Sequence, residues 1–309
     1  MSRELRAALA LVLAIVLVGA AIRFVFPRLA LSIALDLERS RSGLVTRSVT
    51  LPDGLRVAYL EGGKGEPLVL LHGFGGDKDN FTRIARFLTP QYHVIVPDLI
   101  GFGDSSHPVD ADYSPPAQAE RMRAFCQAIG VQAMHLGGSS MGGHVALAWT
   151  VLHPHEVQSL WLLDPGGVWS GPESEVRKTI RVSGKNPLLV ASEDEFAALS
   201  ALVMSKPPPI PRFLMDVLAR ERIRNRRLEE RIFAQITADS VEKRIAGMRK
   251  VTLVVFGAED RVIDPRVAQI LRDLLPLAHV VVMPGVGHLP AIEAPAHTAS
   301  DYIRFRDSM

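Results

Sequence analysis

The chain has 309 residues, of which 48% are apolar and 22% are charged. This length allows one large catalytic domain with a well-filled core. The formal net charge is only +2, so the composition gives no reason to expect a nucleic-acid partner. The single cysteine, Cys126, excludes an intramolecular disulfide, and its apolar surroundings in the sequence predict a buried structural thiol.

The N-terminal segment is unusually apolar. From Ala7 to Ile22 no side chain is polar, and Arg3 and Arg6 precede this run. The stretch approaches the roughly 20 residues that a membrane-spanning helix needs, which predicts an uncleaved anchor within residues 1–28 and a membrane-associated protein. A cleaved signal is the alternative, because the small residues at 19–21 could form a cleavage site, and the protein would then be secreted or periplasmic. A buried helix of a soluble protein is the third interpretation.

After residue 44 the pattern changes to short apolar strands that alternate with helical stretches. The turn residues Pro52-Asp53-Gly54 separate the first two strands and predict a β-hairpin. Six continuous apolar runs follow, as in buried parallel strands. The expected strands are Val45–Thr50, Leu55–Glu61, Leu68–Leu71, His93–Val96, Met134–Leu136, Leu160–Leu163, Val251–Phe256 and His279–Met283, and the expected helices include Phe81–Leu88, Ala117–Ile129 and Pro265–Leu274. This alternation predicts an α/β fold with a mostly parallel, eight-stranded sheet and helices on both faces.

The alternation of strands and helices is interrupted between residues 167 and 246. This stretch is helix-rich and predicts a helical cap, inserted between the core parts 44–166 and 247–309. Its basic cluster from Arg220 to Arg231 is typical of a solvated helix face. Attraction to anionic lipid headgroups is the alternative, given the expected anchor.

A five-residue motif identifies the candidate nucleophile. Gly138-Ser139-Ser140-Met141-Gly142 matches G-x-S-x-G, in which the serine lies on a sharp turn between a strand and a helix. An expected strand precedes the motif and an apolar helical segment follows it. Ser140, unlike Ser139, has glycine two positions before and two positions after it, so Ser140 is the predicted nucleophile.

A serine hydroxyl needs a base, and the base needs an acid that orients it. Where this motif occurs in such a sheet, the chain order is serine, acid, histidine. Asp260 and His288 follow the last two expected strands in that order, at the same edge of the sheet as Ser140. We therefore predict a catalytic triad of Ser140, Asp260 and His288.

Other residues compete for the roles of acid and base. Glu259 and Asp264 neighbour the acid, and Asp164 ends an earlier strand, where Asp164-Pro165-Gly166 predicts a turn. Among the histidines, His153, His155 and His93 lie in a turn or at the start of a strand, so His288 is preferred.

The developing oxyanion needs two backbone N–H donors. Met141 directly follows the nucleophile and supplies one. The loop His72-Gly73-Phe74-Gly75-Gly76 follows an expected strand, and Phe74 is its candidate donor. Its side chain is also expected near the acyl group, whereas His72 is expected to support the loop.

Several motifs together resemble the α/β-hydrolase superfamily. They are His72–Gly76, Pro97–Ser105, Gly138–Gly143, Gly257–Asp260 and Gly287-His288. With the apolar N-terminus, Leu60–Gly63, Lys78–Phe81 and Ser140–Gly143, the chain is similar to bacterial lipases related to membrane-anchored monoacylglycerol lipases. In some members of the superfamily the acid follows the earlier strand, which keeps Asp164 open as an alternative.

The resemblance implies hydrolysis of acylglycerols or similar lipid esters, without a cofactor or a metal ion. Serine at the sharp turn of the G-x-S-x-G motif, called the elbow, argues against haloalkane dehalogenases and epoxide hydrolases, which carry aspartate there. Hydrolases that cleave carbon–carbon bonds of ring-fission diketones are the enzymatic alternative. A membrane-tethered binding protein on an inactive hydrolase fold is the alternative from another class.

Overall fold

The structure, a computed structural model, describes residues 2–309, and the side chains at 14–18, 20–22 and 24 lie outside this description. Within the described range eight strands form one sheet in the order β1-β2-β4-β3-β5-β6-β7-β8. Their bounds are β1 Leu44–Thr50, β2 Arg56–Gly62, β3 Glu66–Leu71, β4 Tyr92–Pro97, β5 Met134–Ser139, β6 Val157–Leu163, β7 Thr252–Gly257 and β8 Ala278–Met283. β1 and β2 form an antiparallel hairpin and β2 runs antiparallel to β4, whereas the other pairs are parallel. The predicted fold class is confirmed.

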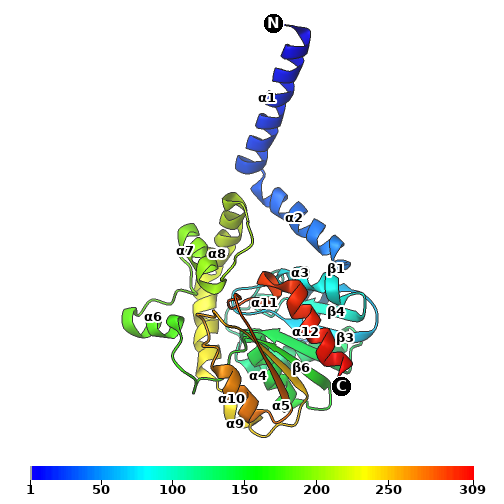
Figure 1. Cartoon of the computed structure of the whole chain (residues 1–309), viewed down its shortest axis with the longest axis vertical. Helices are drawn as coiled ribbons and strands as arrows, with labels where there is room; N and C mark the ends of the chain where they lie inside the picture. The colour runs from blue at the N-terminus through cyan, green and yellow to red at the C-terminus, as the bar shows by residue number, and fades with distance from the viewer. Residues whose placement is uncertain (1) are drawn as a thin grey trace.

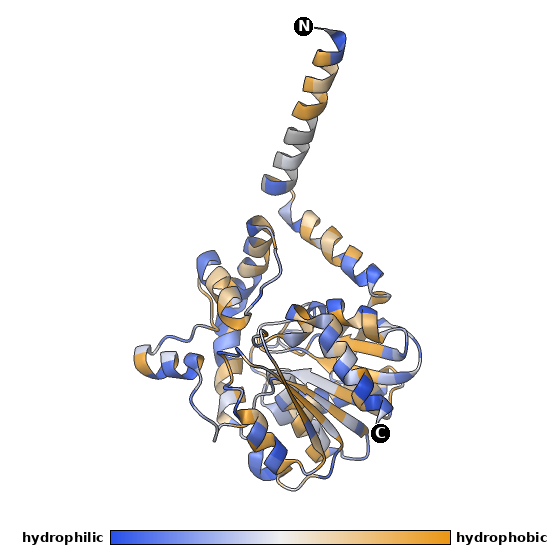
Figure 2. Ribbon diagram, viewed as in Figure 1, coloured by the Kyte–Doolittle hydropathy of each residue, from blue (hydrophilic) through white to orange (hydrophobic). Residues whose placement is uncertain are grey.

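The strands of the sheet bury side chains on both faces. In β3, Val69 and Leu71 belong to one hydrophobic cluster, and Leu68 and Leu70 belong to the other. Successive side chains of a strand point to opposite faces, so burial of both faces requires a continuous apolar run. The strands are accordingly among the most apolar parts of the molecule in Figure 2.

Helices cover both faces of the sheet (Figure 1). The helices α3 (Thr82–Leu88), α11 (Pro290–Glu293) and α12 (Pro295–Asp307) supply residues to the cluster on one face. The helices α4 (Pro115–Ala128), α5 (Met141–Leu152) and α10 (Val267–Leu274) supply residues to the cluster on the other. This arrangement leaves the carboxyl ends of the parallel strands free for a ligand site.

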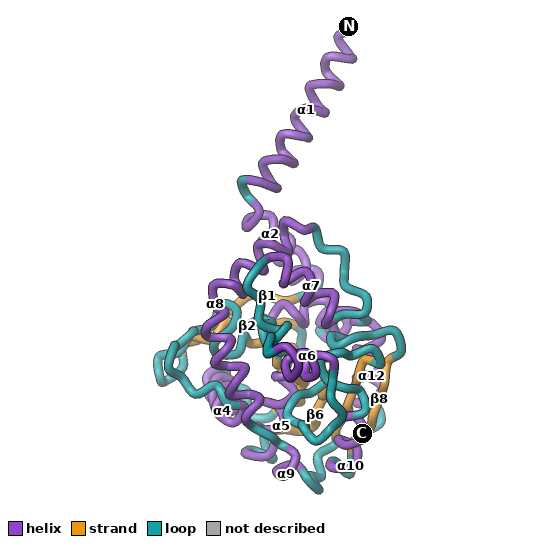
Figure 3. The backbone as a smooth tube through the Cα atoms, turned by 90° about the vertical axis from the view of Figure 1, so that its left-hand side faces the viewer, coloured by secondary structure: helices purple, strands orange, loops and turns teal. Residues whose placement is uncertain are grey.

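The segment between β6 and β7 forms helices instead of continuing the sheet. These are α6 (Glu175–Ser183), α7 (Glu193–Val203), α8 (Arg212–Ala238) and the short α9 (Glu242–Ile245). In Figures 1 and 3, α6, α7 and α8 lie together at one side of the sheet. Three exposed arginines of the predicted basic cluster, Arg220, Arg226 and Arg231, pair with carboxylates, which favours the solvated-face interpretation for these side chains. Arg222 of the same cluster instead pairs with Glu229 in a buried position.

Two helices precede the sheet, α1 (Arg3–Phe24) and α2 (Pro27–Arg41). Figure 1 shows α1 projecting away from the body of the molecule. The helix α2 is fixed to the body, because Arg39 binds Asp79 of the 3-10 helix η1 (Lys78–Phe81) through nitrogen–oxygen distances of 2.7 and 2.5 Å. Among the described residues, no helix combines the length and the apolar character needed to cross a membrane. Part of the predicted anchor falls on the side chains that lie outside the description.

The two largest differences between expected and observed strand boundaries concern β6 and β5. The strand β6 begins at Val157 rather than Leu160, because the buried Ser159 belongs to the strand although it interrupts the apolar run. Its hydroxyl lies 2.8 Å from Nδ1 of His135 on β5, so the polar side chain is satisfied inside the sheet. β5 continues to Ser139 through two glycines that carry no hydrophobic signal.

Candidate active site

Ser140 occupies the sharp turn between β5 and α5. Its φ is 54° and its ψ is −116°, and a positive φ is rare for a residue with a side chain. The N–H of Ser140 donates to the carbonyl of Leu163 at 2.9 Å, and its own carbonyl accepts from Gly166 at 2.9 Å and His144 at 3.1 Å. These bonds hold the strained turn in place, as expected where strain serves a site.

The glycines of the motif permit the close packing of this turn. A Cβ at Gly138 would lie 2.3 Å from the carbonyl oxygen of Gly142, and a Cβ at Gly142 would lie 2.1 Å from that of Leu71. A side chain at either position would therefore displace the backbone. The two adjacent serines differ in their surroundings, since Ser139 is buried at the end of β5, whereas Ser140 lines a cavity.

The predicted base and acid meet at the carboxyl ends of β8 and β7. His288 Nδ1 lies 2.7 Å from Asp260 Oδ2, and both residues are buried. The other oxygen, Asp260 Oδ1, accepts the backbone N–H groups of Val262 at 2.7 Å and Ile263 at 3.1 Å. The carboxylate is thereby aimed at the imidazole, which favours the tautomer with its proton on Nδ1 and leaves Nε2 able to accept a proton.

Two rival acids of the same loop have other partners. Glu259 Oε2 accepts the N–H of Val286 at 2.9 Å. Asp264 is bound by Arg266 at 2.8 and 2.7 Å, and this hydrogen-bonded guanidinium lowers the pKa of Asp264. Neither carboxylate is therefore directed at the histidine.

The third rival, Asp164, lies beside the histidine and its acid. One carboxylate oxygen of Asp164, one of Asp260 and one ring nitrogen of His288 all lie within 4.8 Å of one another. Such a group of donors also has the composition of a metal site. The histidine nitrogen and both oxygens of Asp260 are, however, already engaged in the hydrogen bonds described above.

His72 supports the loop that follows β3. Its Nδ1 donates to the carbonyl of Gly73 at 2.8 Å, and its Nε2 accepts the N–H of Leu99 at 3.0 Å. Complete burial lowers the pKa of His72, so the ring stays neutral and keeps one donor and one acceptor. The neutral imidazole thus ties the loop to the end of β4.

The same loop lies directly against the candidate nucleophile. A Cβ at Gly73 would lie 3.2 Å from the Cβ of Ser140. Within residues 2–309, the N–H groups of Phe74 and Met141 donate to no protein acceptor. Two free backbone donors that flank the serine are what an oxyanion requires.

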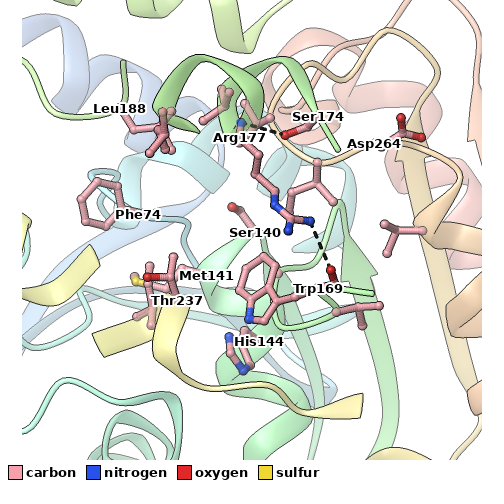
Figure 4. Close-up of a pocket in the computed structure, with 18 of the residues that line it drawn as sticks. Phe74, Ser140, Met141, His144, Trp169, Ser174, Arg177, Leu188, Thr237 and Asp264 are labelled. Carbon is pink, nitrogen blue, oxygen red and sulfur yellow. Dashed lines mark hydrogen bonds between the residues drawn. The ribbon is translucent and has the colours of Figure 1, made fainter. Parts of the chain in front are cut away.

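A cavity of about 490 Å³ lies over Ser140 (Figure 4). Its wall comes from the loop after β3, the elbow, the cap and the segment after β7. The lining is largely apolar, as in sites that take up a hydrophobic ligand. Apolar wall residues are Phe74, Met141, Val168, Trp169, Leu188 and Phe233.

Comparison with known proteins identifies the family. Residues 66–198 match the alpha/beta hydrolase fold. Over 280 residues the chain is 46% identical to Lipase 3 of Moraxella sp. (strain TA144), and this match covers 88% of each chain. The chain belongs to the α/β-hydrolase family. It is also 25% identical to human monoacylglycerol lipase ABHD6 over 254 residues, 78% of this chain and 75% of that one.

A solved structure of this α/β-hydrolase family resembles the whole chain. The crystal structure of a membrane phospholipase A, described as a bacterial virulence factor, has a TM-score of 0.89 and 38% identity, and covers 99% of each chain. The relatives support an ester-hydrolysing serine hydrolase of the lipase and esterase class. The predicted resemblance to lipases and monoacylglycerol lipases is confirmed, and the relatives favour this class over a carbon–carbon bond hydrolase or an inactive binding protein.

In this hydrolase the helical segment between β6 and β7, which we call the cap, contacts the loop His72–Gly76 through Arg222 of α8. We call this loop the oxyanion loop after its predicted role. The guanidinium of Arg222 donates to the carbonyls of Gly75 at 3.1 Å and Leu188 at 2.9 Å, and binds Glu229 at 2.5 and 2.9 Å. The same group lies 5.6 Å from the centre of the Phe74 ring. Burial raises the pKa of Glu229 and the charge of Arg222 opposes this effect, so the two residues form a buried, mutually dependent ion pair.

Two further contacts join the cap to the catalytic edge. The N–H of His288 donates to the carbonyl of Val203 at the end of α7, at 2.8 Å. His144, one turn after Ser140, lies 2.8 Å from Asp239 at the end of α8. Burial lowers the pKa of His144, while its bond to Asp239 opposes this shift. The cap therefore contacts both the loop that carries His288 and the helix α5 that follows Ser140.

Some residues of the cavity carried no signal in the sequence. Trp169 donates from its indole N–H to the carbonyl of Asp239 at 2.6 Å, and Arg177 donates to the carbonyl of Trp169 at 3.2 Å. Neither residue belongs to a motif. Trp169 follows closely after β6, and the carboxyl end of that strand was the one sign that could have pointed to it.

Proposed function

We propose that Ser140, His288 and Asp260 form the catalytic triad of a lipid esterase that works through an acyl-enzyme. Ser140 Oγ attacks the ester carbonyl while His288 Nε2 accepts its proton. The N–H groups of Phe74 and Met141 stabilise the oxyanion. His288 then protonates the departing alcohol, and water, activated by the same imidazole, releases the fatty acid and regenerates the serine.

The observation that carries this proposal is the bond of 2.7 Å between His288 and Asp260 at the edge where the strained Ser140 lines an apolar cavity. The acid is held by two backbone donors and therefore orients the imidazole without needing to move. No step of this scheme uses a metal ion or a cofactor.

Replacement of the serine tests the proposal. Ser140→Ala should lower kcat on p-nitrophenyl esters and monoacylglycerols by roughly 10⁴-fold or more, because the covalent route is lost. Ser139→Ala is the matched control and should keep most of the activity. An inactive Ser139→Ala protein together with an active Ser140→Ala protein would overturn the assignment of Ser140 as the nucleophile. A ring-fission diketone in the same panel would reveal carbon–carbon bond hydrolysis as the main activity.

Acylglycerols are the first candidate substrates, and Arg177 favours glycerophospholipids as a second. Figure 4 shows Arg177 reaching from α6 toward Ser140 and Trp169. Among the described residues Arg177 has no carboxylate partner in an ion pair, whereas Arg181 in the same wall binds Glu173 at 2.8 and 3.0 Å. A guanidinium in an apolar cavity suits a phosphodiester, which it can bind through two N–H groups. The name of the 38% identical membrane phospholipase A supports the same class.

Paired substrates separate the two classes. Arg177→Gln should lower kcat/KM for a lysophospholipid by about tenfold, the usual effect of losing a hydrogen bond to a charged group, and leave the monoacylglycerol of equal acyl length within about twofold. Arg181→Gln changes a neighbouring cation that is already paired, so it should affect both substrates equally. Equal losses on both substrates in Arg177→Gln would remove phosphate recognition from the account.

We further propose that the N-terminal helix attaches the enzyme to a membrane. The apolar run from Ala7 to Ile22 and the projection of α1 away from the body support this proposal. Leu9, Leu11 and Leu13 are exposed on α1 and would be covered by lipid. The relative named a membrane phospholipase A is consistent with attachment.

Fractionation of the full chain and of a chain that starts at Phe26 tests this attachment. The shorter chain keeps α2, which is bound to the body through Arg39. The full chain should remain with membranes after a carbonate wash, while the shorter chain should be released and still hydrolyse short esters. A mature protein whose N-terminus lies near Ala21 would instead establish a cleaved signal.

A further inference from the structure

Asp164 occupies an unusual position at the end of β6. It is fully buried and has a φ of 45°, one of the two positive values among the described non-glycine residues, the other being that of Ser140. Its N–H donates to the carbonyl of Val255 on β7 at 2.8 Å. A buried aspartate in strained backbone costs stability, so its persistence calls for a compensating interaction.

The side chain of Asp164 is only half satisfied by ordinary hydrogen bonds. Its Oδ1 accepts the N–H of Gly257 at 2.9 Å, whereas its Oδ2 has no donor among the described residues. One carboxylate oxygen of Asp164, one of Asp260 and one ring nitrogen of His288 lie within 4.8 Å of one another. An ionised Oδ2 would therefore be a buried anion that faces another buried anion without a donor between them.

One proton removes this conflict. Two carboxyl groups that share a dry site cannot both be ionised, and one of them keeps its proton. Asp260 is the member suited to the charge, because two backbone N–H groups and the imidazole of His288 donate to it. Asp164 has one backbone donor, and burial followed by the charge of Asp260 raises its pKa well above the usual value. The negative charge of Glu293 on α11 also raises the pKa of Asp164.

We propose that Asp164 is a positioning residue that keeps a proton on Oδ2 and donates it in a hydrogen bond to the carboxylate of Asp260. This inference rests on the proposed triad. The bond supplies Asp260 with a further donor, so the charge stays on the carboxylate that contacts the imidazole. In this arrangement the neutral carboxyl of β6, the acid after β7 and the base after β8 form one chain of hydrogen bonds.

Substitution by asparagine imitates the proposed state. In Asp164→Asn the amide oxygen can accept the N–H of Gly257 and the amide NH₂ can donate to Asp260. This variant should retain kcat/KM within about threefold of the wild type. Asp164→Leu removes the donor and should lower kcat/KM about tenfold to a hundredfold, as expected for a lost hydrogen bond to a charged group. Asparagine that is as damaging as leucine, or leucine that is harmless, would overturn the proposal.

Infrared spectroscopy at neutral pH provides a readout that a merely structural role would not change. The difference spectrum of the full-length wild type minus Asp164→Asn should show a positive C=O band of a protonated carboxyl group, because the variant lacks only this carboxyl. Absence of this band from the difference spectrum would overturn the proposal even if the leucine variant does not fold.

Asp260→Asn is measured beside these variants, because it separates the positioning role of Asp164 from the proposed catalytic triad. If Asp260→Asn is inactive and both Asp164 variants equal the wild type, the positioning role fails and the triad stands. If Asp164→Asn is inactive and Asp260→Asn is active, the acid of the triad has been misassigned.

Discussion

The core and the cap of this hydrolase are held together by different means. In the core, β5 and β7 are buried along their whole lengths, and the loops after them are fixed by backbone hydrogen bonds. In the cap, α8 has 27 residues of which four are buried. Its contacts with α7 include ion pairs between side chains at the surface, Arg212 with Asp194 and Arg220 with Glu193.

This difference assigns separate tasks to the two regions. Exposed ion pairs contribute little to stability, so the cap can adjust its position more easily than the edge of a buried parallel sheet. The geometry of the chemical step therefore depends on the core, whereas the wall that selects the substrate depends on the cap. Arg222 is an exception, because it is buried, pairs with Glu229 of the same helix and donates a hydrogen bond to the carbonyl of Gly75 in the loop after β3.

The largest effect is expected in the core. Asp260→Asn should lower kcat by about 10⁴-fold on every ester, because the amide cannot stabilise the charged imidazole or hold its productive tautomer. Asp264→Asn changes a carboxylate of the same loop that is bound to Arg266 and should stay within a few-fold of the wild type. Steady-state kinetics on a short and a long ester measure both variants. A loss confined to the long ester would contradict a role in the chemical step.

The connection between cap and core should give the next largest effect, this time on stability. Arg222→Met leaves Glu229 buried without its cation, and breaking such a pair costs about 3–5 kcal/mol. The double variant Arg222→Met/Glu229→Leu removes both charges and should recover much of this loss in chemical denaturation. Both variants should show reduced kcat, because Gly75 loses its side-chain donor from the cap. Full activity in the double variant would mean that the cap does not support the oxyanion loop.

The smallest effect concerns Asp77, at the end of the oxyanion loop. Burial, followed by the charges of Asp79 and Asp98, raises the pKa of Asp77 to about 7. Between the ordinary value near 4 and about 7 the folded protein binds more protons than the unfolded protein, so stability falls as pH rises through this interval. Asp77→Asn should lack this decline and gain on the order of 1 kcal/mol relative to the wild type between pH 5 and pH 8. Parallel pH dependence of the two free energies of unfolding would refute the assignment.

The sequence predicted the core better than the cap for a physical reason. Buried parallel strands need continuous apolar runs, and Gly138 is required by its close approach to Gly142, four residues further along the same turn. The positions of Trp169 and Arg177 depend instead on how α6 and α8 pack over the sheet, which no local pattern encodes. The partnership of Asp164 with Asp260 was likewise not visible, because it joins the ends of two strands that are far apart in the sequence.

The most direct test of the account is the site of covalent labelling by a fluorophosphonate. The full-length protein should be labelled once, and peptide mass spectrometry should place the adduct on Ser140, because the proposed base and the proposed oxyanion donors serve this serine. His288→Ala should slow this labelling by orders of magnitude, because the base is lost. An adduct on Ser139, or labelling that is unaffected by His288→Ala, would contradict the central claim.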